Sequence, residues 1–428
     1  SRYNNPFDIF TDRAKGTLKW DVDGNEYIDY VMGHGSLILG HAHSSLAAAV
    51  TEQIKKSTHY GTEHKLAVEW AELVHSLIPS AEKVEFCTTG SEAVLTAVML
   101  ARAYTGRYKI LKFARHFHGW SDHMLVGFSA PYDKPLSGHL PPLVDGAVSC
   151  ATYVIPCHDI KALEQALATR EYAAFFIEAG GASGGTICIP DDIIHAAREL
   201  TQKYGTVFVL DEVISGFRWS PGGYQQLVGV MPDLTTLGKI LGGGIGDGAA
   251  VCGKADIMKL LEFKVGDSQW NRYKHVVHLG TWNANPIVAA SGIAMLKNIA
   301  DGKPQKQAAA QAKKLMDGFQ KEIEKRKLEG CAFSTSSTIH LHFGKCKKCN
   351  RECCYDAEKV MPGDISASLN MHLLMNNVHI LKGNQGWVSA AHTDDDIARS
   401  IAAFSRALDG RIADGVFGKL TAGGWSPI

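Results

Sequence analysis

The sequence lacks an excess of charge of either sign and has no long apolar run. Lysine plus arginine and aspartate plus glutamate both number 44, so the formal net charge is zero and nothing favours binding to nucleic acid or to an anionic membrane. The longest apolar runs are far shorter than the about 20 residues of a membrane-spanning helix. No signal peptide, repeat or low-complexity tract is visible, and we expect a cytoplasmic protein.

Cysteine is also too sparse to form a disulfide scaffold. Ten cysteines in 428 residues predict reduced thiols. Four of them are clustered, in Cys346-Lys-Lys-Cys349 and Cys353-Cys354. The first pair has zinc-ligand spacing, but the second pair is adjacent. We favour a surface insertion with free thiols over a structural metal, so no metal site is predicted.

Two common catalytic patterns are missing or misplaced. The glycines at 242–248 do not have the G-x-G-x-x-G spacing of a dinucleotide site. Gly181-Ala-Ser-Gly-Gly185 matches the G-x-S-x-G pattern of serine hydrolases, but that turn needs a helix directly after the serine. Here Thr186-Ile-Cys-Ile-Pro190 follows, so Ser183 is not expected to be a nucleophile.

What the sequence does contain is an apolar run that ends in acids, with a lysine downstream. Val207–Leu210 predicts a buried parallel strand, and Asp211 and Glu212 follow it at the end where open α/β sheets bind ligands. Lys239 lies between an apolar segment and a glycine-rich loop. A lysine Schiff base and an acid at the ring nitrogen are how proteins hold pyridoxal phosphate (PLP). A solvated acid pair and a surface lysine are the alternative.

A second pattern indicates a phosphate site. Residues 83–102 read as a strand, then Thr-Thr-Gly-Ser, then an apolar helix with Ser91 as its N-cap. A helix N-terminus offers free N–H groups and a positive dipole end to a phosphate. The alternative is an ordinary capped helix of any α/β protein.

The order of elements predicts an α/β fold with a mostly parallel sheet covered by helices. A smaller α+β region follows Gly302–Pro304. We expect an N-terminal segment (1–50) that packs with the small domain, a large domain (51–301) and a C-terminal small domain (302–428). The expected strands are 17–21, 26–31, 83–87, 108–113, 147–155, 173–178, 207–210, 249–252, 339–343, 379–381 and 388–390. The expected helices are 44–56, 66–77, 91–102, 160–168, 191–204, 287–299, 307–327 and 394–408.

Together these motifs resemble the fold-type I, class III PLP-dependent aminotransferases over nearly the whole chain. The resemblance rests on the ordered set Thr89-Gly-Ser-Glu-Ala93, Phe117-His-Gly119, Asp211-Glu-Val213, Lys239 and Gly280-Thr281. Gly33-His-Gly-Ser-Leu-Ile-Leu-Gly-His41 and Ala101-Arg-Ala-Tyr-Thr-Gly106 are most similar to the branch of glutamate-1-semialdehyde aminomutase and D-phenylglycine aminotransferase.

The resemblance implies a role for each matching residue. Lys239 would form the Schiff base and later shuttle a proton, and Asp211 would keep the pyridine nitrogen protonated. Thr281 would reach the phosphate of the neighbouring subunit, which implies a homodimer. The other cofactor-binding residues implied are Gly90 and Ser91 at the phosphate, Phe117 and Val213 on the two ring faces, Glu178 near Asp211, and His118.

Three residues are candidates for contact with the substrate. Arg2 lies upstream of the predicted hairpin, at a spacing similar to that of the branch's carboxylate-binding arginine. The alternative is a disordered terminal arginine. His34 and His118 are candidates to line the substrate pocket or are structural histidines.

Three departures from the family pattern border the expected pocket. Ala179 replaces a proline, Ile245-Gly246-Asp247 replaces a leucine-proline continuation, and Phe117 replaces a tyrosine. We therefore predict an aminotransferase acting on an amino acid or amine and an oxo acid. An aminomutase, an elimination lyase and a non-catalytic binding protein on the same scaffold are the alternatives.

Overall fold

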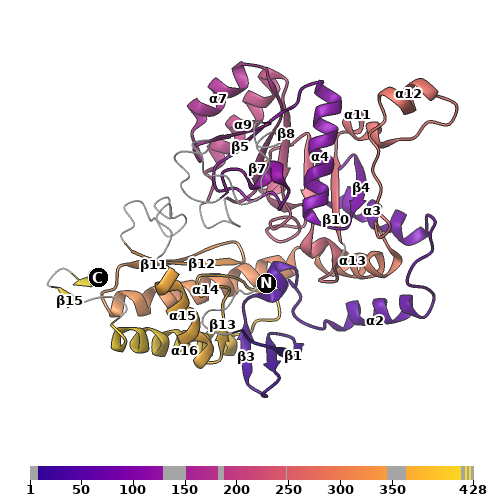
Figure 1. Ribbon diagram of the computed structural model, residues 1–428. Coiled ribbons are helices and arrows are strands. Elements are labelled where there is room, and N and C mark those ends of the chain that lie inside the picture. Colours follow the sequence, from indigo (N-terminus) through magenta and orange to yellow (C-terminus); the bar gives the residue numbers. More distant parts are fainter. Residues whose placement is uncertain are drawn as a thin grey trace. The chain divides into compact units, whose positions relative to one another are not determined.

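The computed structural model describes residues 8–128, 151–181, 188–246, 248–344 and 363–415, with the short pairs 420–421 and 424–425. The chain divides into two compact units. Unit 1 comprises residues 1–47, 185–188 and 301–428, and unit 2 comprises 48–184 and 189–300. Figure 1 labels the elements of both units.

Unit 2 is built on a seven-stranded sheet in the order β4-β10-β9-β8-β7-β5-β6. All neighbouring pairs are parallel except the two that β10 makes, so six strands run in one direction and β10 runs against them. The predicted mostly parallel sheet is therefore confirmed. The strands are β4 (Lys83–Cys87), β5 (Lys109–Phe113), β6 (Thr152–Ile155), β7 (Tyr172–Glu178), β8 (Val207–Asp211), β9 (Leu234–Leu237) and β10 (Ala249–Gly253).

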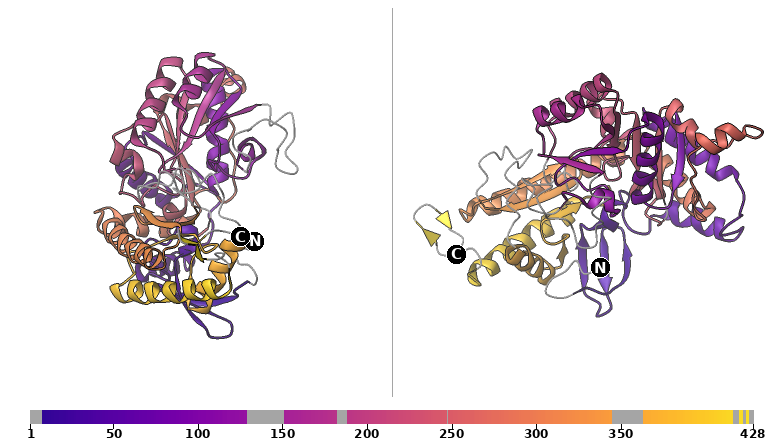
Figure 2. Two further views of the ribbon diagram at one scale, coloured as in Figure 1. Left: turned by 90° about the vertical axis from the view of Figure 1, so that its left-hand side faces the viewer. Right: turned by 45° about the horizontal axis from the view of Figure 1, so that its top comes forward.

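Helices cover both faces of this sheet because its central strands are apolar on both sides. In β7, Phe176 packs toward α4 (Gly90–Thr105) and Phe175 packs toward α7 (Ile160–Ala168) and α9 (Asp191–Tyr204). Figures 1 and 2 show this layering. The remaining helices of unit 2 are α3 (Lys65–Leu77), α5 (Asp122–Leu125), α10 (Gly223–Val228), α11 (Ala255–Met258), α12 (Ser268–Tyr273) and α13 (Pro286–Ile299), with the 3-10 turns η1 (Lys239–Gly242) and η2 (Lys259–Leu261). Helix α2 (Ser44–Ile54) crosses the boundary between the units.

Unit 1 joins the two ends of the chain. The sheet β1-β2-β3-β13 pairs β3 in parallel with β13, and a second sheet has the order β11-β12-β14. A core that includes Phe319 stacked on Phe404, with ring centroids 4.0 Å apart, holds the helices together. The elements are β1 (Thr11–Lys15), β2 (Leu18–Asp21), β3 (Glu26–Asp29), α1 (Met32–Gly35), α14 (Lys303–Lys325), β11 (Gly330–Thr335), β12 (Thr338–Phe343), α15 (Gly363–Met375), β13 (Val378–His379), β14 (Gln385–Trp387), α16 (Asp394–Ala413), β15 (Leu420–Thr421) and β16 (Gly424–Trp425).

Most predicted elements appear within a few residues of their expected ends, with some corrections. The strand predicted at 388–390 is wrong, because Gln385–Trp387 makes the ladder with β12. Strand β9 was not predicted, because Leu-Thr-Thr-Leu is short and half polar. Strands β1 and β11 and helix α15 were also not predicted. The first four residues of the strand expected at 147–155 lie outside the described residues.

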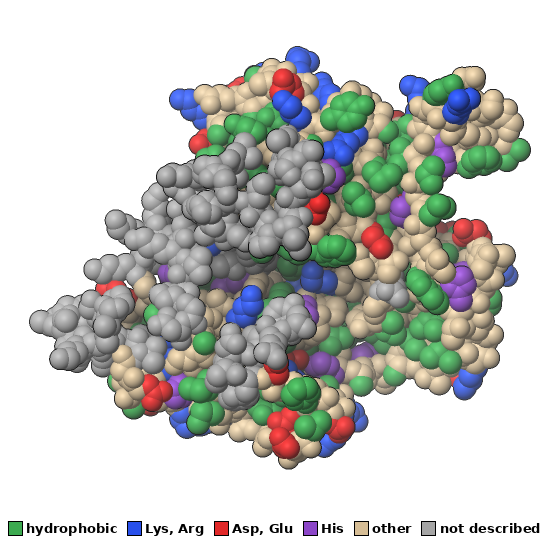
Figure 3. Space-filling view, viewed as in Figure 1, with side chains coloured by type: hydrophobic (Ala, Val, Ile, Leu, Met, Phe, Trp, Pro, Cys, Tyr) green, Lys and Arg blue, Asp and Glu red, His purple; other side chains and the backbone are tan. Residues whose placement is uncertain are grey.

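Among the described residues, no helix combines the length and apolarity that crossing a membrane requires. On the face shown in Figure 3, acidic and basic side chains are interspersed. This distribution agrees with the zero net charge of the sequence.

Candidate active site

The parallel direction of six strands gathers their following loops at one edge of the sheet in unit 2. Seven of the residues predicted from the sequence line a single cavity of about 170 Å³ at this edge. They are Gly90, Ser91, Phe117, Glu178, Asp211, Val213 and Lys239. The cavity is completed by Thr89, Val94, Gly119, Ala179 and Ile214. Two of the departures from the family pattern, Phe117 and Ala179, therefore lie in its wall.

Asp211 ends β8 and is almost fully buried. Its Oδ2 lies 2.8 Å from His118 Nδ1, and its Oδ1 accepts the Val213 N–H at 3.1 Å. Burial lowers the pKa of His118 more than the hydrogen bond to Asp211 raises it, so the ring is neutral and donates from Nδ1. Among the described residues, no lysine or arginine forms an ion pair with Asp211. A buried carboxylate of this kind can accept a further cationic partner from the cavity.

Glu178 lies beside Asp211, because the two residues are register partners in β7 and β8. Its Oε1 accepts the Phe117 N–H at 2.6 Å, and its own N–H donates to His116 Nδ1 at 2.9 Å. Three consecutive residues, 116 to 118, are thus tied to the two acids. The loop after β5 is fixed in the site by these bonds.

Lys239 follows β9 with a left-handed φ of 49°. Among the described residues, its ammonium group has no hydrogen-bond or ion-pair partner. The pKa of Lys239 is lowered because burial disfavours its charged form, and the charge of Arg218 adds to this effect while Asp211 and Glu178 oppose it. A lowered pKa increases the fraction of neutral amine, which is the nucleophilic form.

The start of α4, which the sequence predicts to bind a phosphate, lines the cavity, and the prediction of its cap is corrected. The N-cap is Thr89 rather than Ser91, because Thr89 and Glu92 form a capping box. The first N–H groups of a helix have no acceptor within it. A Cβ added at Gly119, where φ is 89°, would lie 2.6 Å from Ser91 Oγ. Glycine at 119 therefore lets the loop after β5 approach the start of α4 closely.

Among the described residues, His118, Thr281 and His34 were also predicted for the site and do not line this cavity. Thr281 is exposed, and its carbonyl oxygen accepts a hydrogen bond from His59 Nε2 at 2.6 Å. His34 belongs to unit 1, where its ring lies edge-on to Trp387 with centroids 6.4 Å apart. Several candidates lie outside the described residues, namely Arg2, Ser183, Asp247, Cys346, Cys349, Cys353 and Cys354.

Three residues near the cavity were not predicted. Thr89 could have been found from the Thr-x-x-Glu pattern of a capping box. Lys112 is a buried lysine inside β5, its Nζ donates to the Met124 carbonyl at 2.7 Å, and burial lowers its pKa to about 7. The charges of Glu178 and Asp211 partly oppose that shift. The only sequence signal for Lys112 is its place in an apolar strand, and His116 had none.

Comparisons with known proteins agree with this geometry. Residues 1–330 match the model of the family described as aminotransferase class-III. A glutamate-1-semialdehyde 2,1-aminomutase from Sulfurisphaera tokodaii is 33% identical over 408 residues, which cover 94% of this chain and 93% of that protein. The crystal structure of an omega-transaminase from Sphaerobacter thermophilus is 28% identical with a TM-score of 0.85, covering 95% of this chain and 92% of that one. A transaminase with PLP bound is 27% identical with a TM-score of 0.86, covering 97% and 94%.

Proposed function

Because the chain belongs to the class-III aminotransferase family and its cofactor is PLP, we propose that it moves an amino group between an amino acid or amine and an oxo acid. The observation that carries the proposal is the cavity at the end of β8 and β9. Within it, a lysine of lowered pKa, which has no ion-pair partner in the part of the chain that the structure describes, and a buried carboxylate line the same space. These are the two groups that PLP chemistry requires of a protein.

Each cavity residue would have a distinct task. PLP supplies an electron sink for the bonds at the substrate carbon. Lys239 would hold the cofactor and carry a proton to and from the substrate. Asp211 would face the ring nitrogen, oriented by His118 and by the Val213 N–H. The remaining assignments are Gly90 and Ser91 at the phosphate, Phe117 and Val213 on the ring faces, and Glu178 beside the ring.

Thr281 would act across a homodimer interface, on the phosphate of the neighbouring subunit. Its exposure is compatible with that role, and His59 holds its backbone from the same chain. Two further contacts fix the loop. His64 Nε2 lies 2.8 Å from the Ala284 carbonyl oxygen, and Thr88 Oγ1 lies 3.2 Å from Asn283 Oδ1. Arg2 and His34 remain our candidates for the substrate.

An aminomutase is the second candidate. It is favoured by the relatives at 33% identity, which are named as glutamate-1-semialdehyde 2,1-aminomutases. Both reactions use the same residues of this chain for binding and proton transfer. They differ in whether the amino group leaves on a second substrate or returns to another carbon of the first.

An experiment without an added oxo acid separates these reactions. Holoenzyme is mixed with a panel of amino acids, amines and compounds that carry both an amino and an oxo group, and the cofactor spectrum, oxo product, isomerised substrate and ammonia are followed. An aminotransferase converts the cofactor to its aminated form and releases one oxo product per site. An aminomutase acts on a compound with both groups and returns its isomer, with the amino and oxo groups exchanged, over many turnovers. Release of ammonia would contradict both and indicate a lyase.

Replacement of Lys239 tests the assignment of the central residue. We expect Lys239→Ala to lower kcat by about 10³-fold or more, because the proton carrier is removed. The cofactor should also become removable by dialysis. Lys203→Ala, at an exposed lysine of α9, is the matched control and should behave as the wild type. Turnover at the wild-type rate in Lys239→Ala would show that the mechanism is wrong.

A further inference from the structure

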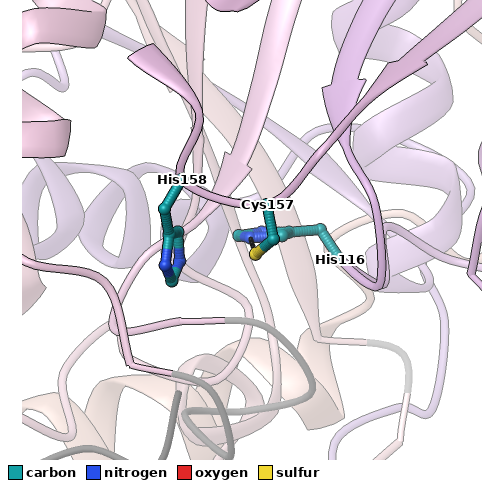
Figure 4. A group of neighbouring side chains, drawn as sticks. All are labelled: His116, Cys157 and His158. Atoms are coloured by element: carbon teal, nitrogen blue, oxygen red, sulfur yellow. Dashed lines mark hydrogen bonds between the residues drawn. The ribbon is translucent and has the colours of Figure 1, made fainter. Parts of the chain in front are cut away.

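Three potential metal ligands lie together beyond the cofactor cavity, on the loops that follow β5 and β6. They are His116, Cys157 and His158, and each offers one ligand atom within 4.8 Å of the other two. Cys157 Sγ lies 3.8 Å from His116 Nε2. Figure 4 shows the three side chains converging from the two loops. None of them lines the cavity described above.

The sheet topology explains why these residues meet. Strands β5 and β6 are parallel neighbours in register from Ile110 and Thr152 to Phe113 and Ile155. Their loops therefore leave the sheet side by side. Both loops contain a non-glycine residue in the left-handed region, Arg115 at φ 68° and His158 at φ 63°. Such conformations cost energy and persist where the surrounding structure enforces them.

The donor set and its spacing fit a soft divalent cation. Thiolate and imidazole are typical ligands of Zn²⁺. With Zn–S of about 2.3 Å and Zn–N of about 2.0–2.1 Å, a tetrahedral ion would separate sulfur and nitrogen by about 3.6 Å, close to the observed distance. Burial lowers the pKa of His158 to about 4 and that of His116 well below its usual value. Both rings are thus neutral, as metal ligands must be.

We propose that His116, Cys157 and His158 form a binding site for a thiophilic divalent cation of the Zn²⁺ type. Three protein ligands leave the fourth position of the ion for water, and the partial exposure of Cys157 and His158 gives the ion access. Binding releases the thiol proton of Cys157 to solvent. The site does not depend on the proposed transfer reaction.

A cation bound at this site would affect the cofactor cavity through His116. Its Nδ1 accepts the Glu178 N–H, so the neutral ring carries its proton on Nε2, which faces Cys157. A metal on Nε2 moves that proton to Nδ1, which then cannot accept. The cation and the hydrogen bond from the Glu178 N–H to His116 Nδ1 therefore cannot be present together. Binding of the cation would leave the backbone N–H of Glu178, a residue that lines the cavity, without this bond.

Co²⁺ binding to the holoenzyme tests the proposal, because tetrahedral Co²⁺ with a thiolate ligand has strong visible d–d bands. All four clustered cysteines are replaced in the background protein (Cys346→Ser, Cys349→Ser, Cys353→Ser and Cys354→Ser), so that thiols outside the proposed site do not bind the probe. In this background we expect one Co²⁺ per chain, displaced by Zn²⁺. Adding Cys157→Ala or His158→Gln should weaken binding by at least about a hundredfold. Adding Cys252→Ala, at a buried thiol of β10, is the control and should leave binding unchanged.

Two results would overturn the site: no tetrahedral Co²⁺ bands in the background protein, or unchanged bands after Cys157→Ala. Circular dichroism and the metal-free cofactor spectrum verify that each variant folds. Zn²⁺ should also shift the cofactor absorbance in the background protein and not in Cys157→Ala. If the cofactor spectrum does not change when Zn²⁺ binds, the proposed coupling through Glu178 is wrong.

Discussion

Two buried aspartates, one in each unit, differ in how completely they are bonded. In unit 1, Asp29 accepts hydrogen bonds from Lys19 Nζ at 3.0 Å, His41 Nε2 at 2.8 Å, and the N–H groups of Val31 and Met32 at 3.0 Å. A carboxylate has about four acceptor positions, so Asp29 is saturated. A saturated acid with its own cation holds structure together.

In unit 2, Asp211 has only two such donors and no cation among the described residues, and it lines a cavity. Its neighbour in sequence, Glu212, resembles Asp29 instead. Glu212 accepts from Ser215 Oγ, from the N–H groups of Tyr224 and Gln225, and from Gln225 Nε2. The number of unused acceptor positions, rather than burial, separates an acid available for chemistry from an acid that stabilises the fold.

The largest effect that this comparison predicts is on activity at Asp211. Asp211→Asn removes the charge that would face the cofactor nitrogen, and we expect kcat to fall by about 10²–10⁴-fold. The unfolding temperature should change little. Glu212→Gln is the matched control, with the opposite pattern: lower stability and near-normal kcat in the folded fraction. Steady-state kinetics measure kcat and thermal unfolding measures stability for both variants. The comparison would be wrong if Asp211→Asn lowered mainly stability and Glu212→Gln lowered mainly kcat.

The next effect is on stability at Asp29. Asp29→Asn leaves Lys19 buried without its carboxylate, which should lower the free energy of unfolding by about 3–5 kcal/mol. Urea unfolding measures the loss. In the control, Lys19→Met is added to Asp29→Asn, so that no buried charge is left unpaired while the Asn oxygen can still accept hydrogen bonds, and much of the loss should be recovered. If Asp29→Asn alone is as stable as the wild type, the saturated network is not structural.

The smallest predicted effect is on the stability of the fold at acid pH. Burial alone would raise the pKa of Asp29, but the His41 hydrogen bond and the Lys19 charge outweigh it and hold the pKa well below the usual 3.8. This depressed pKa contributes stability above pH 3.8 that is lost below it. Burial also lowers the pKa of His392 from 6.5 to about 4, so the unfolded chain binds a proton first as the pH falls.

Stability should therefore decline between pH 6.5 and pH 4, by up to about 1.4 kcal/mol per pH unit for each such histidine. His392→Phe keeps a ring against Tyr30, on which His392 stacks, and should flatten this slope. Thermal unfolding at a series of pH values measures it. If the slope is unchanged in the variant, protonation of His392 does not cause the loss of stability in acid.

The parts of the fold that could be predicted are those that depend on residues close together in the sequence. The apolar runs of β7 and β8 and the capped helices were found, because burial and capping act on residues close in the chain. The members of the site came from the order of family motifs. Asp211 and Glu212 are adjacent acids after one strand, and no local signal says which one is saturated by residues 224 and 225. The bonds from residues 116–118 to Glu178 and Asp211 span more than 60 positions, so periodicity does not report them.

The backbone of Lys239 adds a consequence for how this protein can change. The residue is held at a φ of 49°, a conformation that costs a side-chain-bearing residue about 1–2 kcal/mol and glycine almost nothing. Selection for stability alone would therefore place glycine at this position. A lysine at this position is therefore retained despite the strain of its backbone. If selection on catalysis were relaxed, replacement of the lysine by glycine would increase stability.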